Sequence, residues 1–141
     1  HSLSISFVEI SGLDAVAHQF SHLDGRVAAL MDAHRGQAYY AEYEAKKGRI
    51  RPVHKSALMD ISALEHQLRD RHLYIAGDPD ICRLVGSGPS TWPRTVSANL
   101  FLATEIGRLA FCSKRRWRSG DAITAEPMYI RPPDALKKKN K

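Results

Sequence analysis

The sequence predicts a mixed α/β domain, because helical and strand-like apolar periodicities follow one another along the chain. From residue 11 to residue 23 the apolar side chains recur at helical spacing and form one face: Leu13, Val16, Ala17, Phe20 and Leu23. Residues 37–44 instead alternate in the manner of a strand with two distinct faces. Residues 27–31 form a short unbroken apolar run, typical of a buried central strand. We therefore expect a mixed sheet packed by helices.

The composition is that of an ordinary single domain. The chain has 141 residues, of which 43% are hydrophobic and 26% are charged, and a domain of this length needs neither a disulfide nor a metal for stability. No apolar stretch reaches the roughly 18 residues of a membrane span, and residues 1–5 lack the features of a secretory signal. Cys82 and Cys112 match no metal-ligand spacing. We favour two buried, reduced thiols over a bridge or a reactive site, and we expect a cytoplasmic protein.

The first half of the chain predicts an antiparallel meander that follows the first helix. Ser11 and Asp14 have the spacing of a capping box at the start of that helix. Strands are expected at residues 27–31, 37–44 and 50–53, with turns at 32–36 and 46–49. Two successive turns between strands are typical of a three-stranded meander. On the middle strand, alternation should place Tyr39, Ala41 and Tyr43 on one face and Ala38, Tyr40 and Glu42 on the other.

The second half predicts two further helices and one compact strand. Ser62 and Glu65 indicate the start of a helix that runs to about Arg71 and buries Leu64 and Leu68. The remaining expected elements are a strand at 73–76, a loop at 85–94, a helix from Val96 to about Lys114, an extended segment at 125–131 and a disordered lysine-rich tail at 134–141. The buried face of the last helix should consist of Ala98, Leu102, Ile106, Leu109 and Ala110, with Phe101 at its edge.

Two features invite a binding interpretation. His18 and His22 are four residues apart, a spacing at which two imidazoles can share a metal, but no HExxH-type glutamate lies between them. We favour a solvated polar face there. The formal charge is +6, and basic residues cluster at 46–51, 114–118 and 137–141. Such clusters could approach RNA phosphates, and a solvated basic surface explains them equally well, so both interpretations stay open.

The sequence contains no complete catalytic constellation. P-loop, dinucleotide-binding and nucleophile-elbow patterns are all missing from it, and we expect neither a cofactor nor a metal. The most informative local feature is the turn at 32–36, where Asp32 ends a buried strand beside Arg35 and Gly36. Gly36 permits a positive φ and close backbone approach, and Arg35 could bind a carboxylate or a phosphate. From the residues alone we favour a turn closed by an Asp32–Arg35 pair.

Several segments resemble the TsaB (YeaZ) family. Residues 32–39 are similar to its D-A-R-x-G-E-V-Y hairpin, with His34 in place of the usual arginine and Gln37 in place of the usual glutamate. The other resemblances occur in the family's order: residues 10–17 with its S-S-L-E-A-L-A helix start, 73–78 with its strand and G-D loop, 97–110 with its Ser-Ala helix, and 126–131 with its closing P-x-Y-x-R. The resemblance marks seven residues as the family-motif positions: Asp32, Arg35, Gly36 and Tyr39 in the hairpin, and Pro127, Tyr129 and Arg131 in the closing motif.

The resemblance implies an actin-like, ribonuclease H-like half-domain. The family's N-terminal lobe, with its I-D-T-S strand, has no counterpart here, so residues 1–133 are expected to be the C-terminal lobe and 134–141 a tail. TsaB is a non-catalytic scaffold or dimerisation subunit in the synthesis of N6-threonylcarbamoyladenosine at position 37 of tRNA. It supports the catalytic subunit TsaD together with the ATPase TsaE, and it lacks the metal-binding HxxxH pair of TsaD. His18 and His22 share that spacing but fall in the segment that resembles S-S-L-E-A-L-A.

The resemblance also implies partners and leaves two other functions open. The expected partners are TsaD-like and TsaE-like proteins, with tRNA contacted indirectly and no membrane; a homodimer stays open. One alternative is a lobe of an actin-like ATP-binding enzyme that uses the turn at 32–36. The other is a small basic RNA-binding domain, which requires the lysine and arginine clusters to share one face.

Overall fold

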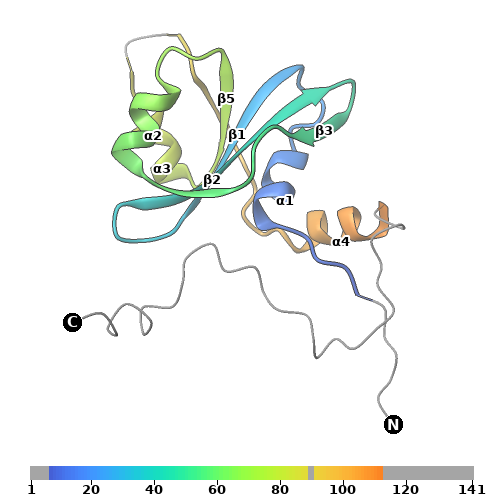
Figure 1. The fold of residues 1–141 in the computed structure, drawn as a ribbon. Helices are drawn as coiled ribbons and strands as arrows, with labels where there is room; N and C mark the ends of the chain where they lie inside the picture. The colour runs from blue at the N-terminus through green and yellow to red at the C-terminus, as the bar shows by residue number, and fades with distance from the viewer. Residues whose placement is uncertain (1–6, 89–90, 113–141) are drawn as a thin grey trace, which may run out of the picture.

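The computed structural model describes residues 7–88 and 91–112, and it confirms the mixed α/β class (Figure 1). The elements, in chain order, are α1 (Gly12–His18), β1 (Gly25–Asp32), β2 (Gln37–Lys46), β3 (Arg49–Pro52), β4 (Ala57–Asp60), α2 (Ile61–Leu68), β5 (Leu73–Gly77), α3 (Pro79–Val85), β6 (Arg94–Ser97) and α4 (Ala103–Cys112). None of the helices in this part of the chain has the length and apolar character needed to cross a bilayer. The expected segment at 125–131, the basic clusters at 114–118 and 137–141, the tail at 134–141 and the lobe boundary at 133 lie outside the described residues.

The described strands form one six-stranded mixed sheet. Its order is β3-β2-β1-β5-β6, and β4 pairs with β2 beside the turn that joins β1 to β2. The pairs β1–β2 and β2–β3 are antiparallel, which confirms the predicted meander, whereas β1–β5 and β5–β6 are parallel. β5 passes very close to β1 where it ends at Gly77, which has a φ of +142°. A Cβ at that position would lie 1.8 Å from the carbonyl oxygen of Leu30, so only glycine fits.

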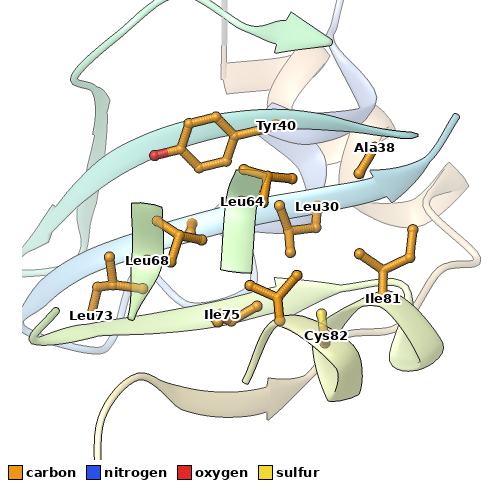
Figure 2. Close-up of a cluster of buried hydrophobic side chains, with 11 residues drawn as sticks. Leu30, Ala38, Tyr40, Leu64, Leu68, Leu73, Ile75, Ile81 and Cys82 are labelled. Carbon is orange, nitrogen blue, oxygen red and sulfur yellow. The ribbon is translucent and has the colours of Figure 1, made fainter. Parts of the chain in front are cut away.

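Helices cover both faces of the sheet, and the alternation predicted for β2 assigns its side chains to these faces. Tyr40 points toward α2 and α3, where bulky aliphatic side chains fill the space between helices and sheet (Figure 2). This cluster includes Leu30, Leu64, Leu68, Leu73, Ile75, Ile81 and Val85. Ala41 and Tyr43 point to the other face, which α1 covers with Leu13, Val16 and Ala17. The predicted burial of Leu64 and Leu68 is confirmed.

The last helix, α4, packs beside α1 and does not lie on the sheet (Figure 1). The prediction for this segment was wrong in two respects. The helix begins at Ala103 and not near Val96, because residues 94–97 pair with β5 as the edge strand β6. None of the α4 residues is buried, and Phe101 is 90% exposed. Ala98 and Leu102 do pack against the core on the α1 side, but they precede the helix.

Both predicted capping boxes were also wrong. Ser11 is the N-cap residue of α1 but makes no side-chain cap bond, and Asp14 instead accepts a hydrogen bond from the Tyr43 hydroxyl. The N-cap of α2 is Asp60 and not Ser62, because β4 leads directly into the helix. The cap that does form was not predicted. The Asp78 carboxylate accepts bonds from the backbone N–H groups of Asp80 and Ile81 at the start of α3.

The two cysteines differ from each other in burial. Cys82 is buried in α3, as expected, and burial raises the pKa of its thiol to about 12, so it stays protonated at neutral pH. Cys112 is exposed at the end of α4, which corrects the expectation of two buried thiols. Both are free, so no disulfide joins them.

Candidate functional site

The turn between β1 and β2 brings together three of the predicted site residues, Asp32, Arg35 and Gly36. Within it, His34, Arg35 and Gly36 all have left-handed backbone conformations, with φ values of 60°, 59° and 72°. The Asp32 carboxylate closes the turn, because it accepts the backbone N–H of His34 at 2.7 Å and lies 2.9 Å from the His34 ring nitrogen Nδ1. Asp32 is therefore paired with His34 in this turn, and the Asp32–Arg35 pair stays a prediction.

This turn is attached to the start of α2. The Gly36 carbonyl accepts the backbone N–H of Ile61 at 2.9 Å, and the Gln37 amide donates to the Asp60 carboxylate at 3.0 Å. Tyr39 does not join the turn, because its side chain lies on the α1 face of the sheet. The hydrogen bonds of the turn therefore position α2. The closing-motif residues Pro127, Tyr129 and Arg131 lie outside the described residues.

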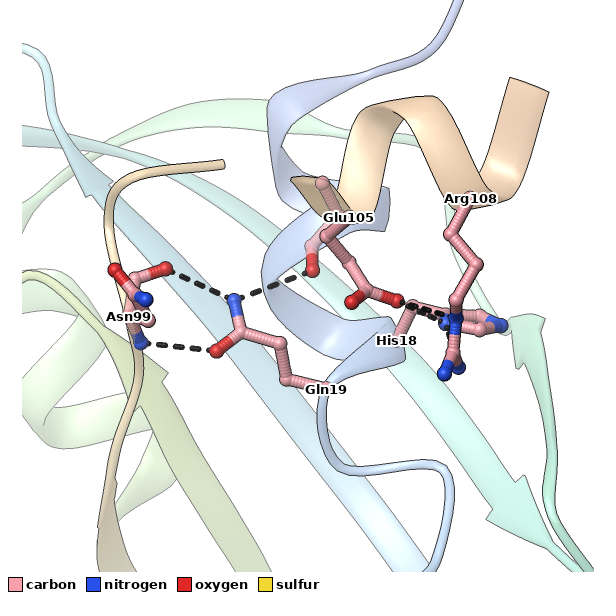
Figure 3. Close-up of polar contacts among 6 residues, drawn as sticks. His18, Gln19, Asn99, Glu105 and Arg108 are labelled. Carbon is pink, nitrogen blue, oxygen red and sulfur yellow. Dashed lines mark hydrogen bonds and ion pairs between the residues drawn. The ribbon is translucent and has the colours of Figure 1, made fainter. Parts of the chain in front are cut away.

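A second polar group joins α4 to the end of α1 (Figure 3). His18 Nδ1 lies 2.6 Å from the Glu105 carboxylate, and Arg108 lies 3.3 Å from the same carboxylate oxygen. Beside them, the Gln19 amide exchanges two hydrogen bonds of 2.9 Å with the backbone of Asn99. His18 is thus a contact residue between two helices, and the prediction that it lies on a solvated face was wrong.

His18 and His22 do not form a metal pair. His22 lies in the turn after α1 ends, so the two imidazoles no longer share a helical face. Within residues 7–88 and 91–112, no group of three histidine, cysteine, aspartate or glutamate side chains could hold a metal ion.

The side of the molecule that carries α1 and α4 has exposed large apolar side chains and a surface hollow. Around α4, Phe101 is 90% exposed, Phe111 72% and Leu100 40%. A hollow of about 490 Å³ lies between α1, β3 and α4, with Asp14, His18, Tyr43 and Leu109 in its wall. Burial and the Asp14 carboxylate raise the pKa of Tyr43, so its hydroxyl remains a donor to Asp14 at 2.7 Å. Exposed aromatic side chains beside a hollow are typical of a protein contact surface.

Sequence reasoning missed one buried polar cluster, which is centred on Glu42. Glu42 is 2% exposed, and its two carboxylate oxygens accept hydrogen bonds of 2.9 Å from Arg71 and one of 2.8 Å from Tyr40. Burial alone would raise the pKa of Glu42, but the bonds from Arg71 and Tyr40 outweigh it and the pKa lies below its ordinary value. Burial and the neighbouring carboxylate raise the pKa of Tyr40 to about 12. The one available signal was an acidic residue on the inward face of β2.

The Glu42 cluster is organised for structure. Both oxygens of the carboxylate are occupied, and Arg26 adds a further cation at 3.7 Å. A carboxylate held in this way stays ionised and has no proton to exchange near neutral pH, so it suits a fixed ion pair better than acid–base chemistry.

The comparisons with known proteins concern the fold. No protein-family model matches the sequence, and no curated protein matches it. A crystal structure described as an uncharacterized protein with similarity to peptidase YeaZ, from Pseudomonas aeruginosa, superposes with a TM-score of 0.63 at 22% identity, over 86% of this chain and 57% of that one. The chain has the fold of YeaZ. YeaZ from Pseudomonas aeruginosa itself matches with a TM-score of 0.56 at 19% identity, over 88% of this chain and 58% of YeaZ. The chain thus spans less than two thirds of either protein.

Proposed function

We propose that the protein is a TsaB-like, non-catalytic subunit in the synthesis of N6-threonylcarbamoyladenosine at position 37 of tRNA. The observation that carries this proposal is the match of fold to the YeaZ-like protein over 86% of the chain. The order of the family-like segments, from residues 10–17 to residues 126–131, supports it from the sequence. The proposed partners are a TsaD-like catalytic subunit and a TsaE-like ATPase in the cytoplasm, with residues 1–133 acting as an actin-like lobe.

The polar contacts of the buried and turn carboxylates are those expected in a scaffold protein. Asp32 is bonded to His34, Glu42 to Arg71, and Asp14 to Tyr43. These carboxylates hold elements of the fold in place, so they are poorly suited to act as a base on a substrate. The exposed apolar side chains around α4, with the adjoining hollow, offer the kind of surface that a protein partner covers. The word peptidase in the description of the solved neighbour belongs to that protein and is not part of this proposal.

The proposal is tested in the organism and with the protein from its complete reading frame. Depletion of the protein should lower the content of N6-threonylcarbamoyladenosine in tRNA, measured by mass spectrometry of digested tRNA. A tagged copy should also capture the TsaD-like protein of the same genome. Unchanged modified nucleoside together with no capture of that protein would reject the proposal.

A titration with ATP distinguishes the alternative function as an ATP-binding lobe. A scaffold should give no heat of binding by calorimetry, whereas an actin-like lobe that uses the turn at 32–36 should bind ATP. Replacement of Arg35 by glutamine should remove such binding if the turn contacts a phosphate. Binding that depends on Arg35 would therefore favour the enzyme alternative over the scaffold.

A further inference from the structure

Positive charge gathers at the β3 edge of the sheet. Residues 45–59 contain five lysine and arginine side chains and no aspartate or glutamate: Lys46, Lys47, Arg49, Arg51 and Lys55. From this concentration and its geometry we propose that the outer face of the β2–β3 hairpin binds the phosphate backbone of a structured RNA. Charge and strand register support a phosphate backbone as the ligand, and the choice of RNA as its source rests on the proposed function.

Strand register places the cations of the hairpin on one face. Lys46 lies directly opposite Arg49, and Glu44 lies directly opposite Arg51. Because Ala45 and its partner Ile50 point toward α1, their neighbours along both strands point to the other face. Lys46, Arg49 and Arg51 therefore share one surface, and with Glu44 and Lys47 they line a hollow of about 350 Å³.

The side chains of these cations have no carboxylate partners within the described part of the chain. Lys46, Lys47, Arg49 and Arg51 are all exposed, and their side chains form no ion pair or hydrogen bond with another described residue. The backbone N–H of Lys47 donates to the Asp24 carboxylate at 3.2 Å. Like charges directly opposite one another destabilise a pair of strands, and Lys46 and Arg49 are such a pair. A bound anion would offset this repulsion, which no side chain lining the hollow other than Glu44 can do.

Two further arginines lie across the sheet from β3 toward β1, and because both lie against the one Glu42 carboxylate they add one net positive charge there. Arg26 on β1 lies opposite Glu44 in the register, and its side chain is 41% exposed. Arg71, 40% exposed, holds Glu42 from the side of α2. Since neighbouring strands lie about 4.8 Å apart, the surface extends over roughly 10 Å from β3 to β1. A surface of this length fits a chain of phosphates better than one isolated phosphate group.

The chemistry of the lining distinguishes RNA from other acidic partners. All five residues around the hollow are charged, and the nearby Ile50 side chain points to the other face. A protein interface normally has an apolar centre with few charges, and stable attachment of a basic surface to a membrane needs a second, apolar anchor beside the charge. Neither is available on this face of the hairpin. A phosphate backbone requires only cations, because its binding is driven by the release of counterions, and without base contacts it would be bound independently of sequence.

The test measures the affinity of the full-length protein for a folded tRNA transcript by fluorescence anisotropy at several salt concentrations. We expect the double variant Arg49→Gln/Arg51→Gln to bind roughly tenfold more weakly at low salt. The slope of log affinity against log salt should fall by about 2, because two phosphate contacts are lost. The single variant Glu44→Gln should bind more tightly, since it removes the one negative charge in the hollow.

A matched control removes the same charge elsewhere. The double variant Arg83→Gln/Arg94→Gln changes exposed cations on α3 and on β6, at the opposite edge of the sheet from β3, and it should leave the salt slope unchanged. Thermal unfolding of each variant checks that the fold is intact. Equal losses of affinity in the two double variants would overturn the proposal. Binding of phosphatidylserine vesicles or polyglutamate without binding of tRNA would also overturn it. Absence of any binding would overturn it as well, and would mean that the cations only protect an edge strand from pairing. Capture of a TsaD-like protein should be the same for all variants, so failure here is distinct from failure of the proposed function.

Discussion

The two faces of the sheet are packed in different ways. On the α2/α3 face, bulky side chains such as Leu30, Leu64 and Leu68 are fully buried and fill the layer (Figure 2). On the α1 face, the helix contributes the small Ala17 beside Leu13 and Val16. Small side chains let the helix approach the sheet closely, but they bury little apolar area. The α2/α3 face therefore owes its stability to apolar volume, and the α1 face to close packing with polar contacts at its margins.

The α4 helix extends this difference. It packs beside α1, none of its residues is buried, and its contacts include the polar group of His18, Glu105 and Arg108 (Figure 3). Elements with few buried apolar contacts open at lower free energy than the core. The α1/α4 side should be the part of the domain that responds most to a partner, and the α2/α3 side the part that keeps the fold.

The largest expected effect is a loss of apolar volume on the α2/α3 face. Leu68→Ala should lower the free energy of unfolding by about 2 to 5 kcal/mol, because the side chain has no exposed surface and leaves a cavity. Leu84→Ala in the same layer is the control, since Leu84 is 54% exposed and should change stability by less than about 0.5 kcal/mol. Urea denaturation measures both, and equal effects would contradict the assignment of this face as the main core.

The second effect concerns the Glu42 cluster on the same face. Glu42→Gln should lower the free energy of unfolding at pH 7 by about 1.5 to 3 kcal/mol, because it removes charge-assisted bonds to Arg71. The folded pKa of Glu42 lies below its ordinary value of 4.5, so its contribution is fully present above pH 4.5 and is lost as the pH falls through the folded pKa. The difference between the two proteins should therefore shrink on acidification below pH 4.5. A difference that stays constant down to the acid transition would show that the charge of Glu42 is not the cause.

A smaller effect is expected on the α1 face. Tyr43→Phe removes the hydroxyl that donates to Asp14 at 2.7 Å, and it should lower the free energy of unfolding by about 1 kcal/mol. Tyr39→Phe is a matched control, because Tyr39 lies on the same face of the same strand. The free energies of unfolding of the two variants, measured by denaturation, should differ by this amount. A Tyr43 variant as stable as the control would show that the bond to Asp14 does not stabilise the α1 face.

The smallest global effect is expected at α4. Glu105→Gln weakens the contact with His18 and Arg108, which is worth at most about 1 kcal/mol for partly exposed groups. Amide hydrogen exchange should become faster in residues 103–112 while β1 amides keep their protection. Faster exchange in β1 as well would mean that the two sides of the sheet unfold as one unit.

Much of the sheet could be predicted from local patterns. The run at 27–31 and the alternation at 37–44 predicted β1, β2 and the assignment of side chains to faces, because a buried face imposes its period directly on the sequence. The strand at 73–76 followed in the same way. The four-residue strands β4 and β6 were missed, because such short strands exist only through pairing with β2 and β5, and their side chains are half-exposed or exposed.

The candidate sites differ in the same way: contacts between adjacent residues could be predicted, and contacts between distant residues could not. The Asp32 turn was predicted because all of its residues are adjacent, and within it the Asp32 carboxylate contacts His34. The Glu42–Arg71 pair joins residues 29 apart, and the His18–Glu105 pair joins residues 87 apart. Local periodicity therefore determined β1, β2 and β5, and the faces to which the β2 side chains point, by itself. Only the tertiary structure decided which charges meet, because a side chain interacts with its neighbours in space, whatever their separation along the chain.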